Sequence, residues 1–324
     1  MGVEGDAGKV KHSMSDLKQK QSLSLGAKVR MTINRIKQWY EHWDGRVYVA
    51  FSGGKDSTVL LHLVRSIYPD VVAVFFDTGL EYPEVRDFVK TIDNVIWLKP
   101  KMPFNQVIDK YGYPVVSKEQ AQCIYELRTQ NVSPESRAKR LTGVGKPSGQ
   151  RTLSLKWQYL LGAPFSISHR CCSIMKKRPA DAFSKELGLK RMTGTMAGDS
   201  RLRAATWIKQ GCNAFDSSKP ASAPLSFWLE SDIWAYIQQE NLEYSEIYNM
   251  GYDRTGCMFC MFGVHMEGEP NRFQRMQKTH PKQWKFCMDK LGLREVLKYI
   301  GVPCEYREPD EMLFNLKTKG QEND

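Results

Sequence analysis

The fold is decided by residues 47–64, which read Val-Tyr-Val-Ala-Phe-Ser-Gly-Gly-Lys-Asp-Ser-Thr-Val-Leu-Leu-His-Leu-Val. Residues 47–51 are apolar, β-branched or aromatic, and this pattern predicts a strand that is covered on both faces. Leu60, Leu61 and Val64 fall on one helical stripe, so a helix is expected to follow the glycine turn. We therefore interpret the stretch as a strand, a phosphate loop and a helix.

The glycine turn carries the residues of an anion site. Gly53 and Gly54 let backbone N–H groups approach an anion, and Ser57 opens a helix whose positive end faces that anion. Lys55 adds a positive charge. The P-loop pattern GxxxxGK[ST] does not fit, because Asp56 stands where Ser or Thr is required. A purely structural strand-to-helix turn is the alternative, but such a turn does not need these charged and hydroxyl side chains together.

Length and composition set the limits of the chain. Its 324 residues, 41% of them hydrophobic, can bury one large α/β core with an appended subdomain or two modest domains. We predict a flexible basic arm over 1–25, a nucleotide-binding α/β domain with a cysteine site over 26–275, and a helical extension over 276–324. No apolar run approaches the roughly 20 residues of a membrane span, and we expect a cytoplasmic protein. The net charge of +11 suits anionic nucleotides or nucleic acid, although a diffuse basic surface is the alternative.

Further strands define the fold class. Residues 71–76 and 95–98 form two more apolar runs, and strands that alternate with helices predict a doubly wound, mostly parallel α/β sheet with helices on both faces. The helical periodicity of the last part predicts a helical C-terminal region. Ligands lie beyond the carboxyl ends of parallel strands, so Asp77 and Thr78 belong with the glycine loop. Taken alone, Asp77 is also a candidate helix cap.

Four cysteines form two pairs, Cys171-Cys172 and Cys257-x-x-Cys260. In a reducing compartment, clustered thiols favour metal or catalytic roles over disulfides. Two pairs suit one tetrahedral ion or an iron–sulfur cluster. The side chains of adjacent cysteines diverge, and this favours a cluster over a single zinc ion. Structural zinc and unliganded thiols remain open alternatives.

The segment 131–150 is polar and rich in Gly and Pro, and it is the longest candidate loop. It is either a substrate clamp or a solvated insertion. The basic residues in or beside it are Arg137, Lys139, Arg140, Lys146, Arg151 and Lys156.

Two motifs carry a resemblance to a known family. Ser-Gly-Gly-Lys-Asp-Ser at 52–57 resembles the PP-loop of the ATP pyrophosphatase superfamily. Together with Asp-Thr-Gly-Leu-Glu-Tyr-Pro-Glu at 77–84, it resembles the phosphoadenosine phosphosulfate (PAPS) reductase family. The resemblance implies a nucleotide-binding α/β fold in which residues 52–57, from Ser52 to Ser57, lie at the phosphates and Asp77 and Thr78 lie near the nucleotide.

A second loop and the cysteines extend the resemblance. The family's Gly-x-Arg-x-x-Glu-Ser-x-x-Arg pattern is matched at Gly194, Ser200 and Arg203, while Met196 and Asp199 replace its first Arg and its Glu. Arg201 is an additional anion partner on the same loop. Adenylylsulfate reductases carry a Cys-Cys followed by a distant CxxC that holds a four-iron, four-sulfur cluster. The resemblance therefore favours a 4Fe-4S cluster at Cys171, Cys172, Cys257 and Cys260, with zinc as the alternative.

The intact loop directs the functional hypothesis. PP-loop enzymes split ATP between its α- and β-phosphates, so the resemblance implies adenylation with pyrophosphate release, followed by sulfur transfer. Lys55 and Asp56 are the candidate catalytic residues, and Asp56 or Asp77 is the candidate Mg²⁺ ligand. The implied partners are a nucleotide, a nucleic-acid acceptor and a sulfur-donor protein.

Two other functions remain open. A reductase of PAPS or adenylylsulfate (APS) would use a cysteine in a C-terminal Glu-Cys-Gly segment, which this sequence lacks, and Cys304 is the only candidate in the tail. A non-catalytic nucleotide-sensing co-activator is the third hypothesis, and the intact Lys55 and Asp56 argue against it.

Overall fold

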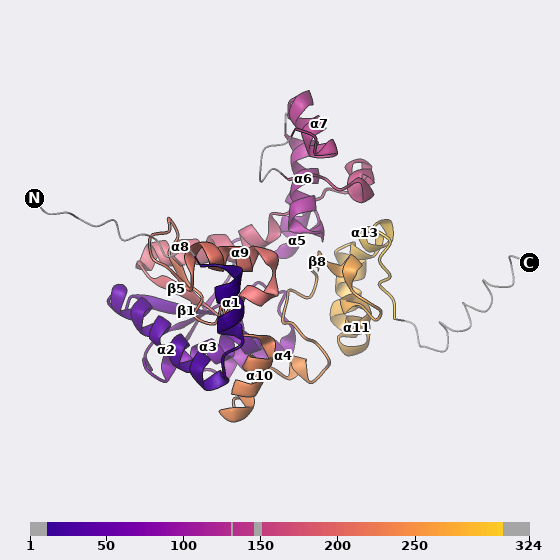
Figure 1. Ribbon diagram of the computed structural model, residues 1–324. Helices are drawn as coiled ribbons and strands as arrows, with labels where there is room; N and C mark the ends of the chain where they lie inside the picture. The colour runs from indigo at the N-terminus through magenta and orange to yellow at the C-terminus, as the bar shows by residue number, and fades with distance from the viewer. Residues whose placement is uncertain (1–11, 131, 146–150, 307–324) are drawn as a thin grey trace, which may run out of the picture. The chain divides into compact units, whose positions relative to one another are not determined.

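The computed structural model describes residues 12–130, 132–145 and 151–306 (Figure 1). The chain divides into two compact units. Unit 1 contains Met1–Lys101 and Lys176–Cys257, and unit 2 contains Met102–Met175 and Met258–Asp324. The domain boundaries that we expect from the sequence, after residues 25 and 275, remain predictions about which parts fold independently.

Unit 1 is built on a six-stranded sheet in the order β3-β2-β1-β5-β7-β6. Its strands are β1 (Val47–Phe51), β2 (Ala73–Phe76), β3 (Val95–Leu98), β5 (Lys190–Thr193), β6 (Asn213–Ala214) and β7 (Ala221–Ser222). All neighbours pair in parallel except β6 with β7. In the centre, Val49 of β1 is in register with Ala73 of β2 and Met192 of β5. The doubly wound, mostly parallel fold is thus confirmed.

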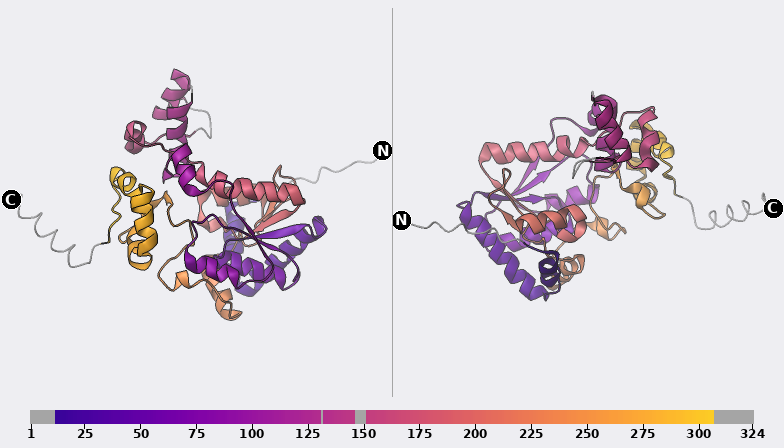
Figure 2. Two further views of the ribbon diagram at one scale, coloured as in Figure 1. Left: turned by 180° about the vertical axis from the view of Figure 1, so that it is seen from behind. Right: turned by 45° about the horizontal axis from the view of Figure 1, so that its top comes forward.

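Helices cover both faces of this sheet, which explains the unbroken apolar run of β1. Val47, Val49 and Phe51 point into the larger core, which the helices α2 (Leu25–His42) and α3 (Lys55–Arg65) complete. Tyr48 points to the opposite face, where it packs with Val74 and with Phe183 of α8 (Arg178–Leu187). Figures 1 and 2 show the strands between α8 on one side and α2 and α3 on the other. A strand buried on both faces needs apolar residues at consecutive positions.

The helices of unit 1 are α1 (Met14–Gln21), α2 (Leu25–His42), α3 (Lys55–Arg65), α4 (Pro83–Lys90), α8 (Arg178–Leu187), α9 (Arg201–Gln210) and α10 (Glu230–Gln239), with 3₁₀ turns at Ala197–Asp199 and Glu246–Tyr248. The flexible arm predicted over 1–25 is wrong for α1. Ser13 and Asp16 form a capping box at its start, and Leu17 is buried. Reciprocal capping and one buried leucine stabilise this short helix despite its polar composition. Residues 1–11 lie outside the described residues.

Unit 2 is mainly helical. It contains α5 (Phe104–Tyr111), α6 (Lys118–Thr129), α7 (Pro134–Thr142), α11 (Arg272–Thr279), α12 (Pro281–Lys285) and α13 (Leu293–Tyr299), with 3₁₀ segments at Leu155–Gly162 and Val264–Met266 and a π-helical turn at Phe286–Lys290. A second π-helical turn, Ser173–Lys177, leads from unit 2 into α8 of unit 1. The strands β4 (Val115–Val116) and β8 (Met261–Phe262) pair in parallel. The helical C-terminal region is confirmed up to residue 306.

The loop predicted over 131–150 contains a helix instead. Ser133 caps α7 by accepting a hydrogen bond from Ser136 N, and Gly143 ends it in the left-handed conformation. These are ordinary start and stop signals, but no residue of α7 is buried, so no apolar periodicity marked the helix. Residues 131 and 146–150 lie outside the described residues. Among the helices that the structure describes, none is long and apolar enough to cross a membrane.

Candidate functional site

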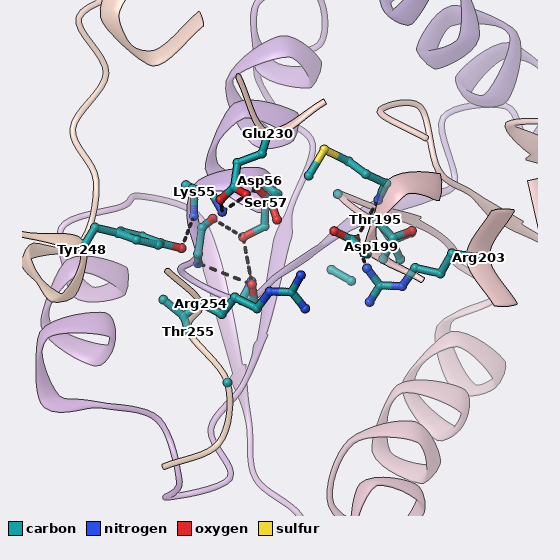
Figure 3. Close-up of a pocket in the computed structure, with 17 residues that line it drawn as sticks. Lys55, Asp56, Ser57, Thr195, Asp199, Arg203, Glu230, Tyr248, Arg254 and Thr255 are labelled. Carbon is teal, nitrogen blue, oxygen red and sulfur yellow. Dashed lines mark hydrogen bonds and ion pairs between the residues drawn. The ribbon is translucent and has the colours of Figure 1, made fainter. Parts of the chain in front are cut away.

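A cavity of about 350 Å³ lies in unit 1 at the carboxyl ends of β1 and β5. Four parts of the chain line it: the glycine loop, the segment that follows β5, Glu230 at the start of α10, and a late segment that contributes Tyr248 and residues 254–256 (Figure 3). This is the place where open parallel sheets bind ligands, because strand ends and helix starts meet there. We take it as the candidate nucleotide site.

The glycine loop is fixed by its own packing and hydrogen bonds. Gly53 has a φ of +70°, and a Cβ there would lie 2.6 Å from a methyl carbon of Val89 in α4. Only glycine fits this position without strain. Ser57 Oγ accepts a hydrogen bond from Ser52 N at 3.2 Å and donates one to Gly54 O at 2.8 Å. The loop is therefore held in one shape by its own residues.

Lys55 lies between two carboxylates. Its Nζ is 3.0 Å from Glu230 Oε1 and 3.4 Å from Asp56 Oδ1, and its side chain is only 5% exposed. Burial alone would lower the pKa of Lys55, but the nearby Asp56 and Glu230 carboxylates raise it above the ordinary value. Lys55 is thus a fixed cation at neutral pH on the floor of the cavity.

Asp56 has the opposite balance. Burial raises the pKa of Asp56, and the attraction of Lys55 only partly offsets this effect. The buried Oδ1 of Asp56 accepts no hydrogen bond from the residues that the structure describes. The nearest positive charge to this oxygen is Lys55 Nζ, at 3.4 Å. A buried carboxylate oxygen that keeps acceptor capacity suits a hard cation, so Asp56 fits the Mg²⁺ expected at this loop.

Asp77, the other candidate Mg²⁺ ligand, is engaged elsewhere. Its Oδ2 pairs with Arg86 Nη2 at 3.0 Å, and its Oδ1 accepts a hydrogen bond from Gly79 N at 3.2 Å. Thr78 donates a hydrogen bond to the buried Glu81 at 2.8 Å. The residues after β2 therefore form their own network near the strand ends, and neither predicted residue lines the cavity.

Two arginines face the cavity from different segments. Arg203 of α9 pairs with Asp199, whereas Arg254 makes no ion pair or hydrogen bond with the described residues through its side chain. Burial lowers the pKa of Arg203, and the positive charge of Arg254 lowers it further. Figure 3 shows the two guanidinium groups approaching the same space. Two like charges in one cavity are most stable when an anion lies between them.

Tyr248 also occupies part of the loop. Its hydroxyl accepts a hydrogen bond from Lys55 N at 2.9 Å, which uses the first amide of α3 (Figure 3). Thr255 approaches the loop from the same late segment, because a Cβ on Gly54 would lie 2.5 Å from its Oγ1. This segment thus fits closely against the loop.

The structure brings some predicted site residues together and leaves others apart. The predicted residues that line the cavity are Ser52, Gly54, Lys55, Asp56, Ser57, Gly194 and Arg203. Gly53 does not line the cavity, but its backbone packs closely against Val85 and Val89. Ser200 caps α9 by accepting a hydrogen bond from Arg203 N, and Arg201 follows it as an exposed residue. The nucleotide-binding roles of all these residues remain predictions.

Among the lining residues that the sequence analysis did not assign to the site, four with polar side chains come from late in the chain: Glu230, Tyr248, Arg254 and Thr255. Each lies more than 170 positions after the glycine loop. No spacing rule connects residues so far apart. The only available signal was the position of Arg254 and Thr255 directly before the CxxC.

The predicted metal ligands belong to both units. In unit 2, the sulfur atoms of Cys171 and Cys172 are 3.9 Å apart. Burial raises the pKa of the Cys260 thiol, and the nearby Cys172 raises it further. Thiolates suit zinc or an iron–sulfur cluster. Within the described parts of the chain, no set of three or more His, Cys, Asp or Glu side chains is arranged to hold a metal ion. The cluster remains a prediction.

Cys257 belongs to unit 1, where it interacts with a lysine that the sequence analysis did not assign to the site. Lys176 Nζ lies 3.2 Å from Glu81 Oε1. Burial by itself would lower the pKa of Lys176, but the charges of Cys257 and Glu81 raise it. Glu81 in turn accepts hydrogen bonds from Thr78. A chain of polar contacts thus connects Cys257 to the end of β2.

Comparison with known proteins gives one family match. The model of the phosphoadenosine phosphosulfate reductase domain matches residues 46–129 and 125–262. An uncharacterised protein of Methanocaldococcus jannaschii is 23% identical over 310 residues, which cover 90% of this chain and 61% of that protein. A second one from the same organism is 28% identical over 79% of this chain and 43% of its own length. The chain thus spans about half the length of these two curated relatives.

Other relatives have named activities. The adenosine 5'-phosphosulfate reductase of Staphylococcus epidermidis is 26% identical over 248 residues, 75% of this chain and 83% of that protein. Among solved structures, PAPS reductase from Candida auris in a phosphate complex aligns with a TM-score of 0.41 and 18% identity, over 77% of this chain and 98% of that one. U34-tRNA thiolase NcsA from Methanococcus maripaludis, with its [4Fe-4S] cluster, aligns with a TM-score of 0.37 and 14% identity, over 87% and 84%.

Proposed function

Because the chain belongs to the phosphoadenosine phosphosulfate reductase family, whose model matches well over half of it, we propose that it binds ATP in the unit 1 cavity and adenylates an acceptor. An acceptor oxygen attacks the α-phosphorus, the bond to the bridging oxygen breaks, and pyrophosphate leaves. A sulfur nucleophile then displaces AMP from the adenylated acceptor. One observation supports this proposal above the others: the intact loop holds a buried Lys55 between Asp56 and Glu230, and Arg254, which makes no ion pair with the described residues, lines the same cavity.

The residues of the cavity suit pyrophosphate as a leaving group. Lys55 and Arg254 would bind the β- and γ-phosphates and stabilise the charge that develops on them. Mg²⁺, when bound at Asp56, would neutralise the same oxygens. Lys55 Nζ lies 3.0 Å from Glu230 Oε1, and a bound phosphate would compete with Glu230 for that cation. Arg203, held by Asp199, would orient the α-phosphate.

The cysteines would serve the sulfur transfer step. Cys171, Cys172, Cys257 and Cys260 are the proposed ligands of a 4Fe-4S cluster, which would hold or deliver sulfur when bound. A sulfur-donor protein and a nucleic-acid acceptor are the proposed partners. The proposed location is the cytoplasm, where such thiols stay reduced.

Reduction of a sulfonucleotide is the second candidate, and the similarity to APS reductases favours it. That reaction needs a cysteine thiolate that attacks sulfur. Cys304 does not suit this role, because burial raises the pKa of its thiol and Arg294 does not offset the rise.

Pyrophosphate release tests the proposal. The purified chain, with ATP, Mg²⁺ and candidate acceptors, should release pyrophosphate and form AMP. Release of orthophosphate without pyrophosphate would contradict adenylation. Binding titrations with ATP, PAPS and APS separate the two candidates, because adenylation predicts the tightest binding for ATP. Tighter binding of PAPS or APS, with formation of sulfite, would establish the reductase instead.

A further inference from the structure

More than half of the net positive charge of the chain lies in one segment of unit 2. Residues 102–175 contain ten Lys and Arg and four Asp and Glu, a surplus of six out of the net +11 of the whole chain. This segment forms α5, α6, α7 and the 3₁₀ segment Leu155–Gly162 (Figure 1). A local surplus of this size attracts a polyanion rather than one small ion.

Beside this charge, unit 2 has a second cavity, of about 290 Å³. Its lining joins the 3₁₀ segment, through Lys156, Trp157 and Tyr159, to residues near His265 and to the stretch that follows α13. The volume is well above that of one water molecule. It is large enough for a flat aromatic ring with polar substituents.

Aromatic side chains form the wall of this cavity and continue onto the surface. The Trp157 ring lies edge-on to His265, with centroids 4.9 Å apart, and Lys156 Nζ lies 5.0 Å from the Trp157 centroid. Tyr159 is 46% exposed and contacts Tyr299 of α13 at 5.8 Å. Leu155 next to them is 83% exposed. Exposed aromatic rings interleaved with lysine are typical of surfaces on which nucleic-acid bases stack.

Polar groups at the cavity are suited to the edge of a base. His265 Nδ1 is buried and has no hydrogen-bond partner among the described residues. Glu267 is neutralised by Arg272, whose Nε donates to its Oε1 at 2.7 Å. Glu269 is exposed and its Oε2 accepts a hydrogen bond from Gln274 Nε2 at 3.3 Å, so only part of its acceptor capacity is used within the protein. The cavity therefore offers an aromatic wall and one buried ring nitrogen, His265 Nδ1, that has no partner among the described residues.

We propose that this cavity receives one unpaired base of a single-stranded nucleic acid, whose phosphates contact Lys156 and the basic segment around it. The exposed Tyr159 stacks on the base, and Trp157, which is only 7% exposed, forms the inner wall of the cavity. RNA and DNA share this chemistry, and the experiment below distinguishes them. The role of this strand as the acceptor of the reaction rests on the proposed function. The binding of the strand to this cavity does not depend on that function.

The test is fluorescence anisotropy of the full chain with three labelled probes of one sequence: a 15-nucleotide RNA, the corresponding DNA, and their DNA duplex. We expect binding of a single strand and weaker binding of the duplex, since a paired base cannot enter the cavity. RNA tighter than DNA would indicate contacts to the 2'-hydroxyl. Equal or tighter binding of the duplex would overturn the proposal.

Variants locate the binding surface. Tyr159→Ala should weaken single-strand binding roughly 5- to 150-fold, while Tyr159→Phe should retain it. Lys156→Gln should reduce the slope of log affinity against log salt by about 0.7. Phe286→Ala and Lys282→Gln are matched controls, because both residues are exposed in unit 2 outside the cavity. Unchanged binding in Tyr159→Ala, with an unchanged melting temperature, would overturn the proposal.

Lys55→Ala separates this inference from the proposed function. It should reduce kcat/KM for pyrophosphate release about 10²- to 10³-fold and leave strand binding unchanged. If ATP gives no pyrophosphate but the strand still binds through Tyr159, the proposed function fails and this inference stands. If pyrophosphate is released and no single strand binds, the reverse holds.

Discussion

The two units organise their candidate sites in different ways. In unit 1, backbone geometry shapes the cavity, because a left-handed glycine and the ends of two adjacent parallel strands place the loop before any side chain is considered. In unit 2, the two strands are two residues long each, and exposed side chains on helical segments form the surface. The first arrangement is typical of a rigid site for a small, highly charged ligand. The second is typical of a surface for a large and adaptable one.

The largest expected effect concerns the proposed cluster ligands, which are Cys257 in unit 1 and Cys171, Cys172 and Cys260 in unit 2. Protein purified without oxygen should be brown and contain iron. Cys260→Ser in unit 2 and Cys257→Ser in unit 1 should each remove the colour completely, measured by absorbance and iron analysis. Cys287→Ser is the control, because that cysteine lies outside both pairs. A colourless protein with one zinc ion would contradict the cluster, and colour retained in Cys257→Ser would assign the ligands to unit 2 alone.

Lys55 tests whether unit 1 alone carries nucleotide chemistry. Removing a fixed cation from a preorganised site costs about 10²- to 10³-fold in rate, so Lys55→Ala should reduce kcat/KM for pyrophosphate release by that factor. Lys90→Ala is the control, since Lys90 is exposed and pairs only with Asp87. Activity within twofold of the wild type would mean that the loop is merely structural.

The frame of unit 1 depends on a buried ion pair. Lys28 of α2 is 1% exposed, and its Nζ lies 2.6 Å from Asp232 Oδ2 of α10. Lys28→Ala leaves a carboxylate without its cation and should lower the free energy of unfolding by about 3 kcal/mol. Denaturant unfolding curves measure this free energy, and Lys37→Ala is the control because Lys37 is exposed. The proposed strand-binding cavity lies in unit 2, so Lys28→Ala should leave single-strand binding unchanged at temperatures below the melting temperature of the variant.

Arg254 and Arg201 give a smaller and matched comparison within unit 1. Arg254→Gln should weaken ATP binding about tenfold, because it removes a charged hydrogen-bond donor from the cavity. Arg201→Gln should change affinity by less than twofold, since Arg201 does not line the cavity. Isothermal titration measures both. Equal losses in the two variants would mean that only the total charge matters.

The smallest expected effect is that of Asp56 on how the stability of the fold depends on pH. Its pKa is raised on folding, so its contribution to stability is present below the unfolded pKa and is lost as pH rises through the folded pKa. At pH 7 the ionised carboxylate opposes folding. Asp56→Asn should raise the melting temperature by on the order of 2 °C at pH 7, and the difference should shrink toward pH 4. A lower melting temperature at pH 7 would show that the carboxylate stabilises the fold.

The contrast between units also explains what could be predicted from the sequence. β1, the loop and the start of α3 follow from local patterns, because residues 47–64 contain both elements and their connection. β3 follows from its own apolar run at 95–98. Glu230 and Arg254 could not be predicted, since only the folded sheet brings α10 and the late segment to the loop. Asp77 was placed at the correct strand end, but sequence does not show that Arg86 holds it. In unit 2, α7 buries no residue, so no periodicity revealed it.

The fit of Gly194 against the glycine loop has a consequence for mutational tolerance. A Cβ on Gly194 would lie 2.7 Å from the backbone oxygen of Asp56, so even alanine would force the end of β5 away from the start of α3. Gly198 and Gly256, which also lie near the cavity, have no atom within 4 Å of such a carbon. A saturation library scored for activity should therefore reject alanine at 194 and accept it at 198 and 256. The pattern of tolerated glycines would outline the cavity without any ligand.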